Sequence, residues 1–141
     1  MASAVKTATG AIYSHLSTNI TSIASGWSSN TNVAWPGVDY TPASTWIRPI
    51  ILWGDGFPSS MGASGTNLIF GSLELSLFAR PGSGYGTLNG YADKVRDLFD
   101  RASPGSNVEF LAASGPRQVN TQDTRWLEIT LSIPFVLEDA S

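Results

Sequence analysis

The sequence contains no cysteine and a single histidine, His15, among its 141 residues. Without cysteine the chain can form neither a disulfide nor a thiolate metal site, and any catalytic triad or histidine-based metal cluster would depend on one residue. His15 stands beside Ile12 and Leu16 at the border of an apolar stripe, so a packed or capping role is expected rather than a catalytic one. The sequence therefore predicts no cofactor and no metal site.

Charged residues are also scarce, at 13% against about a quarter in average chains. The net charge is −3, and the eight basic residues are scattered, apart from Arg96 and Arg101 on one short segment. An acidic chain of this kind does not fit a general binder of phosphate backbones, so we expect no direct nucleic-acid readout. Its five tryptophans are typical either of a protein interface or of an aromatic core, and composition leaves both open.

Long apolar runs and hydrolase motifs are missing too. No apolar run approaches the ~18 residues of a membrane span, and the opening MASAVKTATG has no hydrophobic signal core. We therefore expect a protein of a cytosol-like compartment with no membrane partner. No serine stands in a G-x-S-x-G elbow, to which GASG at 62–65 comes nearest, and we expect no enzyme.

A glycine-rich stretch, RPGSGYG at 80–86, stands between an expected strand and an expected helix, where dinucleotides often bind. Its spacing, Gly82-x-Gly84-x-Gly86, is one residue short of the dinucleotide fingerprint. No acidic residue stands where a ribose partner belongs, and the preceding strand alternates polar and apolar residues. The stretch is expected to form a turn and not a nucleotide site.

Three carboxylates, Asp93, Asp97 and Asp100, lie along one helical stripe and could suggest a metal site. They alternate with basic residues, and Asp97 stands four residues before Arg101, the spacing of a helical ion pair. We therefore predict a solvated face that neutralises itself.

Two amphipathic helices are predicted, over 5–23 and 88–99, because apolar residues recur there at spacings of three and four. The expected caps and stops are Ser3 and Gly26 for the first helix, and Thr87 and residues 103–105 for the second.

The predicted strands cover residues 33–35, 45–53, 68–80, 108–112 and 125–137. Apolar and polar residues alternate in the third and the last, which is typical of an antiparallel sheet with one buried face. Pro49 lies inside the second and cannot donate a ladder hydrogen bond, so that strand is expected to have an edge or a bulge there. The predicted fold is α+β: a mostly antiparallel or mixed β-sheet with two helices packed on one face.

Residues 53–67, which we call the arm, join two of these strands and consist largely of turn-forming residues. A loop of this length is usually functional or disordered, and we expect a flexible hairpin arm. Trp53, Asp55, Phe57 and Met61 are the candidate contacts to another subunit or a partner, because large apolar groups on a free loop would promote aggregation. The alternative is that the aromatic side chains fold back onto the domain.

The sequence resembles the tail terminator-like proteins of long-tailed bacteriophages in three stretches, which follow one another in the family's order. They are VAWPGVDYTPASTWIRPIIL (33–52), which follows an amphipathic helix, GSLELSLFARPGSGYGTLNGYADKVRDLF (71–99) and RWLEITLSIPFVLEDAS (125–141). Together with the first helix they cover nearly the whole chain, and their order and spacing carry the resemblance.

The resemblance implies one α+β domain over residues 1–141 that assembles as a ring, usually of six subunits. Such a ring sits on the finished tail tube in the virion tail or neck, stops further addition to the tube and offers a surface to the head-side connector. The implied partners are further copies of the chain, the tail tube protein and the head–tail connector protein, with assembly in the host cytoplasm and no catalysis. Two alternatives stay open: another neck component (a head-completion or head–tail joining protein) and a small-ligand binding module.

Overall fold

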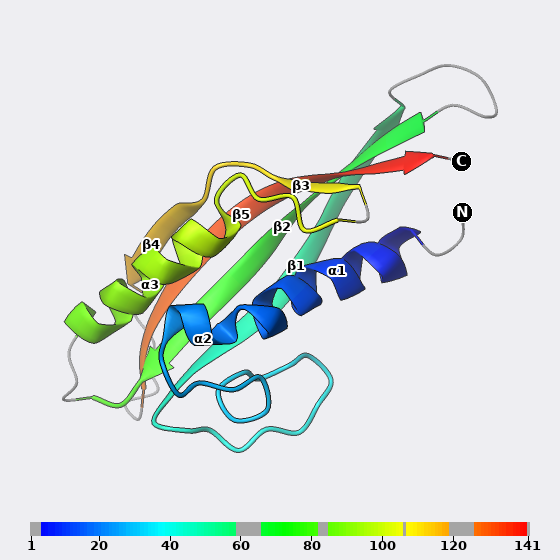
Figure 1. The fold of residues 1–141 in the computed structure, drawn as a ribbon. Coiled ribbons are helices and arrows are strands. Elements are labelled where there is room, and N and C mark those ends of the chain that lie inside the picture. Colours follow the sequence, from blue (N-terminus) through cyan, green and yellow to red (C-terminus); the bar gives the residue numbers. More distant parts are fainter. Residues whose placement is uncertain (1–3, 59–65, 82–84, 106, 119–125, 141) are drawn as a thin grey trace.

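The computed structural model describes residues 4–58, 66–81, 85–105, 107–118 and 126–140. These residues form three helices, α1 (Ala4–Thr18), α2 (Ile20–Ile23) and α3 (Tyr85–Phe99), and five strands, β1 (Thr45–Pro58), β2 (Thr66–Ala79), β3 (Val108–Phe110), β4 (Ser114–Gln118) and β5 (Leu127–Ala140). Figure 1 shows the helices on one side of a long, twisted sheet. The fold is α+β, as predicted.

The named strands pair only antiparallel, in the order β1–β2–β5–β3, with β4 also on β5. β3 and β4 cover successive parts of the same side of β5, where Phe110 lies opposite Phe135 and Arg117 opposite Thr130. β1 therefore forms one edge of the sheet, and β3 with β4 forms the other.

Pro49 lies on the outer side of β1, where a proline removes no ladder hydrogen bond. Ile47 donates its N–H to the carbonyl of Asn32 (2.9 Å) and accepts a hydrogen bond from the N–H of Ala34 (2.9 Å). Its backbone groups thus point away from β2, and those of Pro49, two residues on, point the same way. The predicted edge position is confirmed, whereas the strand predicted at 33–35 amounts to one isolated parallel bridge to Ile47.

The core lies between the sheet and the helices. The odd-numbered residues 73–77 of β2 and 129–137 of β5 face the helices and are buried, as the alternation in the sequence predicted. Each such side chain contributes about 1.5–3 kcal/mol by leaving water. The largest fully buried side chains come from both layers: Ile12, Leu16, Ile47, Leu73, Leu75, Leu77, Leu88, Phe99, Ile129, Leu131, Ile133 and Phe135.

The predicted helix ends were partly wrong. The first helix is interrupted at Asn19, whose side-chain amide donates to the carbonyl of His15 (2.9 Å), so the N-terminal layer consists of α1 and α2. α3 begins at Tyr85, two residues before the predicted cap Thr87. It ends at Phe99, as the apolar spacing predicted, and beyond this end Arg101 adopts a left-handed conformation (φ 56°) and donates its N–H to the carbonyl of Leu111. Ser3 lies outside the described residues.

The loop predicted from 54 to 67 is shorter than expected. β1 and β2 continue into it and pair as far as Pro58 opposite Asn67, with a register shift between Trp53 and Gly56. Cross-strand backbone pairing thus outweighs the weak strand preference of glycine and proline in this segment. Residues 59–65 lie outside the described part of the chain.

β4 was not predicted, because its sequence SGPRQ has no apolar alternation. Pairing with β5 forms it, and Arg96 of α3 donates to the carbonyl of Gly115 (2.5 Å) at its start. The strand is thus a product of tertiary contacts.

Candidate interaction surface

One face of the sheet turns away from the helices, and we call it the helix-free face. It consists of the even-numbered positions 46–52 of β1, 68–78 of β2 and 128–138 of β5, with Glu109 of β3 and Arg117 of β4. The odd-numbered positions of β1, β2 and β5 beside them face the core, as do Val108 and Phe110 in β3, so strand geometry directs the side chains of this face to the opposite side.

The centre of the helix-free face is a polar network that the chain satisfies itself. The Ser72 hydroxyl donates to Glu74 Oε2 (2.6 Å), and the Ser132 hydroxyl donates to Glu74 Oε1 (2.7 Å). The hydroxyls of Ser76 and Thr130 lie 3.3 Å apart. Because part-buried Glu74 accepts two hydrogen bonds, both of its carboxylate oxygens have a donor within the chain.

An aromatic cluster covers one end of the helix-free face. Trp46 stacks on Phe78 (ring centroids 4.0 Å apart, planes 12° apart) and meets Trp126 edge-on at 5.6 Å. Two guanidinium groups lie over these rings, Arg48 above Phe78 at 5.1 Å and Arg80 above Trp126 at 4.3 Å. Such cation–π contacts are worth about 0.5–1 kcal/mol at exposed sites, and they hold both arginines on this face.

The opposite end of the helix-free face carries both exposed apolar side chains and two glutamates, Glu109 and Glu138. Ile50, Leu52 and Phe70 are among the exposed large hydrophobic side chains, with 38%, 54% and 40% of their surface accessible. Beside them a recess of about 330 Å³ is lined by Leu68, Phe70, Asn107, Glu109, Val136 and Glu138. Exposed apolar side chains gathered on one face mark a contact surface more often than scattered ones do.

The tryptophans take part mainly in packing within the chain. Trp27 is buried in the main core, and Trp46 and Trp126 are buried in the aromatic cluster. Trp35 and Trp53 are partly buried and pack against the main core. The aromatic-core interpretation therefore accounts for all five.

The predicted contact residues of the arm do not lie together on a loop. Trp53 belongs to β1, is partly buried, and meets Phe135 edge-on with ring centroids 5.2 Å apart. It therefore folds back onto the domain, which was the alternative interpretation. Asp55 and Phe57 lie in β1 beyond Trp53, with side chains outside the described set, and Met61 lies outside the described residues. The contact role of these three stays a prediction.

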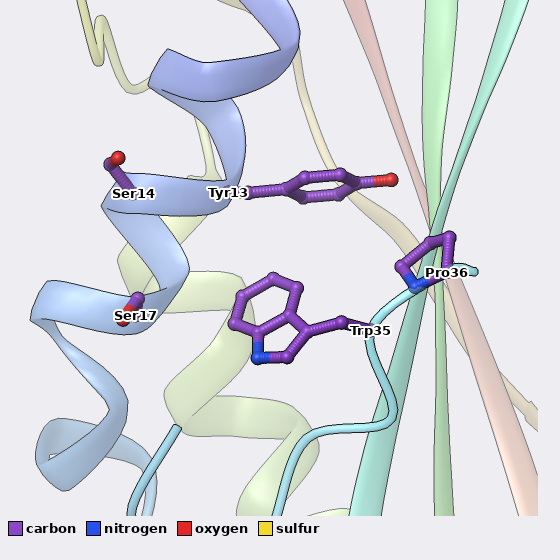
Figure 2. A pocket seen from close by; sticks show the side chains of 5 residues that line it. All are labelled: Tyr13, Ser14, Ser17, Trp35 and Pro36. Carbon is purple, nitrogen blue, oxygen red and sulfur yellow. The ribbon is translucent and has the colours of Figure 1, made fainter. Parts of the chain in front are cut away.

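A second recess, of about 320 Å³, lies beside α1 (Figure 2) and is lined by Tyr13, Ser14, Ser17, Trp35 and Pro36. The rings of Tyr13 and Trp35 meet edge-on at 5.3 Å, and partial burial raises the pKa of the Tyr13 hydroxyl. The Trp35 indole N–H donates to the carbonyl of Ser29 (2.8 Å). None of these five lining residues is charged, so the recess offers a ligand aromatic surface and hydroxyl groups.

The predicted helical ion pair between Asp97 and Arg101 is not formed, because Arg101 lies beyond the end of α3 in a left-handed conformation. An ion pair that does form among the described residues joins Arg48 and Glu128, with 3.9 Å between Arg48 Nη2 and Glu128 Oε2. The Asp100 carboxylate instead accepts a hydrogen bond from the N–H of Ala113 (2.8 Å).

No group of three or more potential metal ligands occurs among the residues that the structure describes. His15 is packed as predicted: its Nε2 lies 2.9 Å from the carbonyl oxygen of Leu98, and its ring meets Phe99 edge-on. In the glycine-rich stretch, Gly82 and Gly84 lie outside the described residues, while Gly86 belongs to α3.

Within the described part of the chain, no helix is both long and apolar enough to cross a membrane.

No protein-family model matches the sequence, and no curated protein does. Comparison with solved structures does give matches. One is a chain from the virion of a native gene transfer agent (GTA) particle, with a TM-score of 0.56, 17% identity and 92% of each chain covered. The fold is shared with a virion chain.

A further solved structure, whose name gives no function, matches with a TM-score of 0.56 and 15% identity over 94% of this chain and 95% of that one. At such identities both likenesses establish the fold and nothing finer. They extend over almost the full length of all the chains compared, so they concern the whole domain.

Proposed function

We propose that this chain is a structural protein of a phage-like virion, and that it forms a ring that caps the tail tube. The ring ends elongation of the tube and joins the tail to the head-side connector. It works by contact and steric exclusion, without a catalytic step. Its partners are other copies of the chain, the tail tube protein and the head–tail connector protein.

The observation that carries the proposal is the fold shared with the gene transfer agent virion chain over 92% of both chains. The three sequence stretches that resemble tail terminator-like proteins add support from an independent source. The exposed side chains on the helix-free face fit a protein that works through contacts, since Ile50, Leu52 and Phe70 lie there together.

A small-ligand module would require an apolar pocket between the sheet and the helices. In the described residues that space is occupied by core side chains such as Leu75, Leu131 and Phe99. The recess at Tyr13 and Trp35 lies beside α1 instead. The contact function is therefore the better supported of the two.

Light scattering on a sizing column, followed by negative-stain images of the peak, tests the self-assembly. We expect a closed ring of about six copies with a central hole, because cyclic symmetry limits the assembly to a fixed size. Addition of purified tail tubes should place the ring at one tube end and stop further tube growth. A protein that stays monomeric both alone and with tubes would refute the ring. A ring that binds the head-side connector but not the tube would instead identify another neck component.

A further inference from the structure

The charges on the helix-free face are unevenly compensated. Glu74 accepts two serine hydroxyls, and Glu128 pairs with Arg48. By contrast, the carboxylates of Glu109 and Glu138 have neither an ion-pair partner nor a hydrogen-bond donor among the described residues. Both line the apolar recess, and we call this region the acidic end.

Two arginines without a carboxylate partner in the part of the chain that the structure describes, Arg80 and Arg117, lie toward the opposite end of the same face. Arg80 stacks on Trp126 and has no carboxylate partner in the described chain. Arg117 makes one long hydrogen bond, to the hydroxyl of Ser132 (3.4 Å). These two residues, with the aromatic cluster beside them, form what we call the arginine end.

The two ends are too far apart to neutralise each other within one molecule. Arg117 lies opposite Thr130 on β5, and Glu138 lies eight residues further along that strand. At the rise of an antiparallel strand this separation is roughly 27 Å. It exceeds the Debye length of about 8 Å at physiological ionic strength, so each end presents its charge to whatever binds there.

The acidic end is complementary to a partner with two features. One is apolar surface, aromatic or aliphatic, and the other is a cationic group, guanidinium or ammonium. Leu68, Phe70 and Val136 provide apolar surface in the recess, while Glu109 and Glu138 provide carboxylates. Carboxylates bind guanidinium groups through charge-assisted, often bidentate, hydrogen bonds. The arginine end of the same chain has this composition, with guanidinium groups held over tryptophan and phenylalanine rings.

We propose that the helix-free face is a contact between copies of this chain, in which the arginine end of one copy binds the acidic end of another. Arg80 and Arg117 of one copy then pair with Glu109 and Glu138 of the next, and the exposed apolar side chains beside the recess are covered. The inference deepens the proposed function, because it rests on self-assembly and names the surface that carries it. Complementary charges of this kind set orientation and partner choice more than raw affinity.

Charge reversal tests the contact. One variant carries Glu109→Arg and Glu138→Arg, and the other carries Arg80→Glu and Arg117→Glu. We expect each variant alone to lose at least tenfold in self-association, because like charges then face each other. An equimolar mixture should recover association, since each reversed end now meets its opposite. A chain with all four substitutions should also recover it.

Two matched controls change the same amount of charge on exposed helix positions: Asp93→Arg with Asp97→Arg on α3, and Lys6→Glu with Lys94→Glu on α1 and α3. These should self-associate like the wild type. Circular dichroism and thermal melting establish that every variant is folded, and sedimentation velocity at low and high salt measures association. Wild-type association should weaken as salt rises.

The outcomes separate this inference from the ring itself. If the wild type forms rings and both reversed variants do so equally well, the contact is wrong and the ring proposal stands. Loss of association without recovery in the mixture also overturns the contact. A wild type that never associates, alone or on tubes, overturns both.

Discussion

Replacing Gly71 with valine is expected to lower the free energy of unfolding by about 3 kcal/mol, as overpacking of a tight core does. In a domain of this size such a loss lowers the melting temperature by roughly 6–12 °C. Gly71 lies in the middle of β2, between Trp53 of β1 and Phe135 of β5. Valine favours strands, so any loss of stability comes from packing and not from strand propensity.

The physical reason is the ring of Phe135. A Cβ atom at position 71 would lie 2.5 Å from Phe135 Cζ and 2.9 Å from the carbonyl oxygen of Leu52. The ring is fully buried and meets Trp53 and Phe110 edge-on, so moving it disturbs both contacts. Gly71 is thus the position that lets the Phe135 ring lie across β2.

Denaturant unfolding measures the effect. Gly56→Val in β1 is the matched control, because its Cβ would meet nothing nearer than 3.7 Å, and we expect a change below about 1 kcal/mol. Adding Phe135→Leu to Gly71→Val should cost less than the sum of the two single changes, since the smaller side chain relieves the clash. Wild-type stability in Gly71→Val would show that the ring moves at no cost.

The core of this fold could be predicted from the sequence because burial repeats with the period of each element. Leu73, Leu75 and Leu77 alternate with polar residues and indeed face the helices. The same rule failed for β4 and for the ends of β1 and β2, where no apolar alternation exists and pairing with a neighbouring strand decides the structure.

The candidate surface was harder to predict, because it depends on register. Arg80 and Arg117 are 37 positions apart in the sequence, and Glu109 and Glu138 are 29 apart. Only the pairing of β5 with β2, β3 and β4 places each pair at one end of a face. The sequence carried one usable signal, because Phe70, Phe78 and Val136 stand on the same faces of β2 and β5 as the polar residues.

The three large apolar residues of the arm do not share one role. The composition of the arm suggested that Trp53, Phe57 and Met61 act together, but Trp53 packs against Phe135 in the sheet. A substitution that combines all three would therefore mix loss of stability with loss of contact. The two effects have to be measured on different variants.

Replacing Phe57 and Met61 together with serine is expected to leave the domain folded and to impair assembly on the tail tube. The reason is compositional: two large apolar side chains among glycines and serines gain most when a partner covers them. Trp53→Ser, in contrast, should destabilise the domain by about 2 kcal/mol, because it removes a partly buried ring from the edge of the core.

Denaturant unfolding and tail length in electron micrographs, measured on the same variants, separate the two roles. We expect the free energy of unfolding of the Phe57/Met61 variant to lie within about 1 kcal/mol of the wild-type value, and its tails to be overlong or headless. We expect Trp53→Ser to be less stable but, after correction for its folded fraction, to give tails of normal length. Tails of normal length and infectious particles from the Phe57/Met61 variant would exclude the arm as a contact. Assembly would then depend on the sheet faces and edges, where the charge-reversal variants measure it directly.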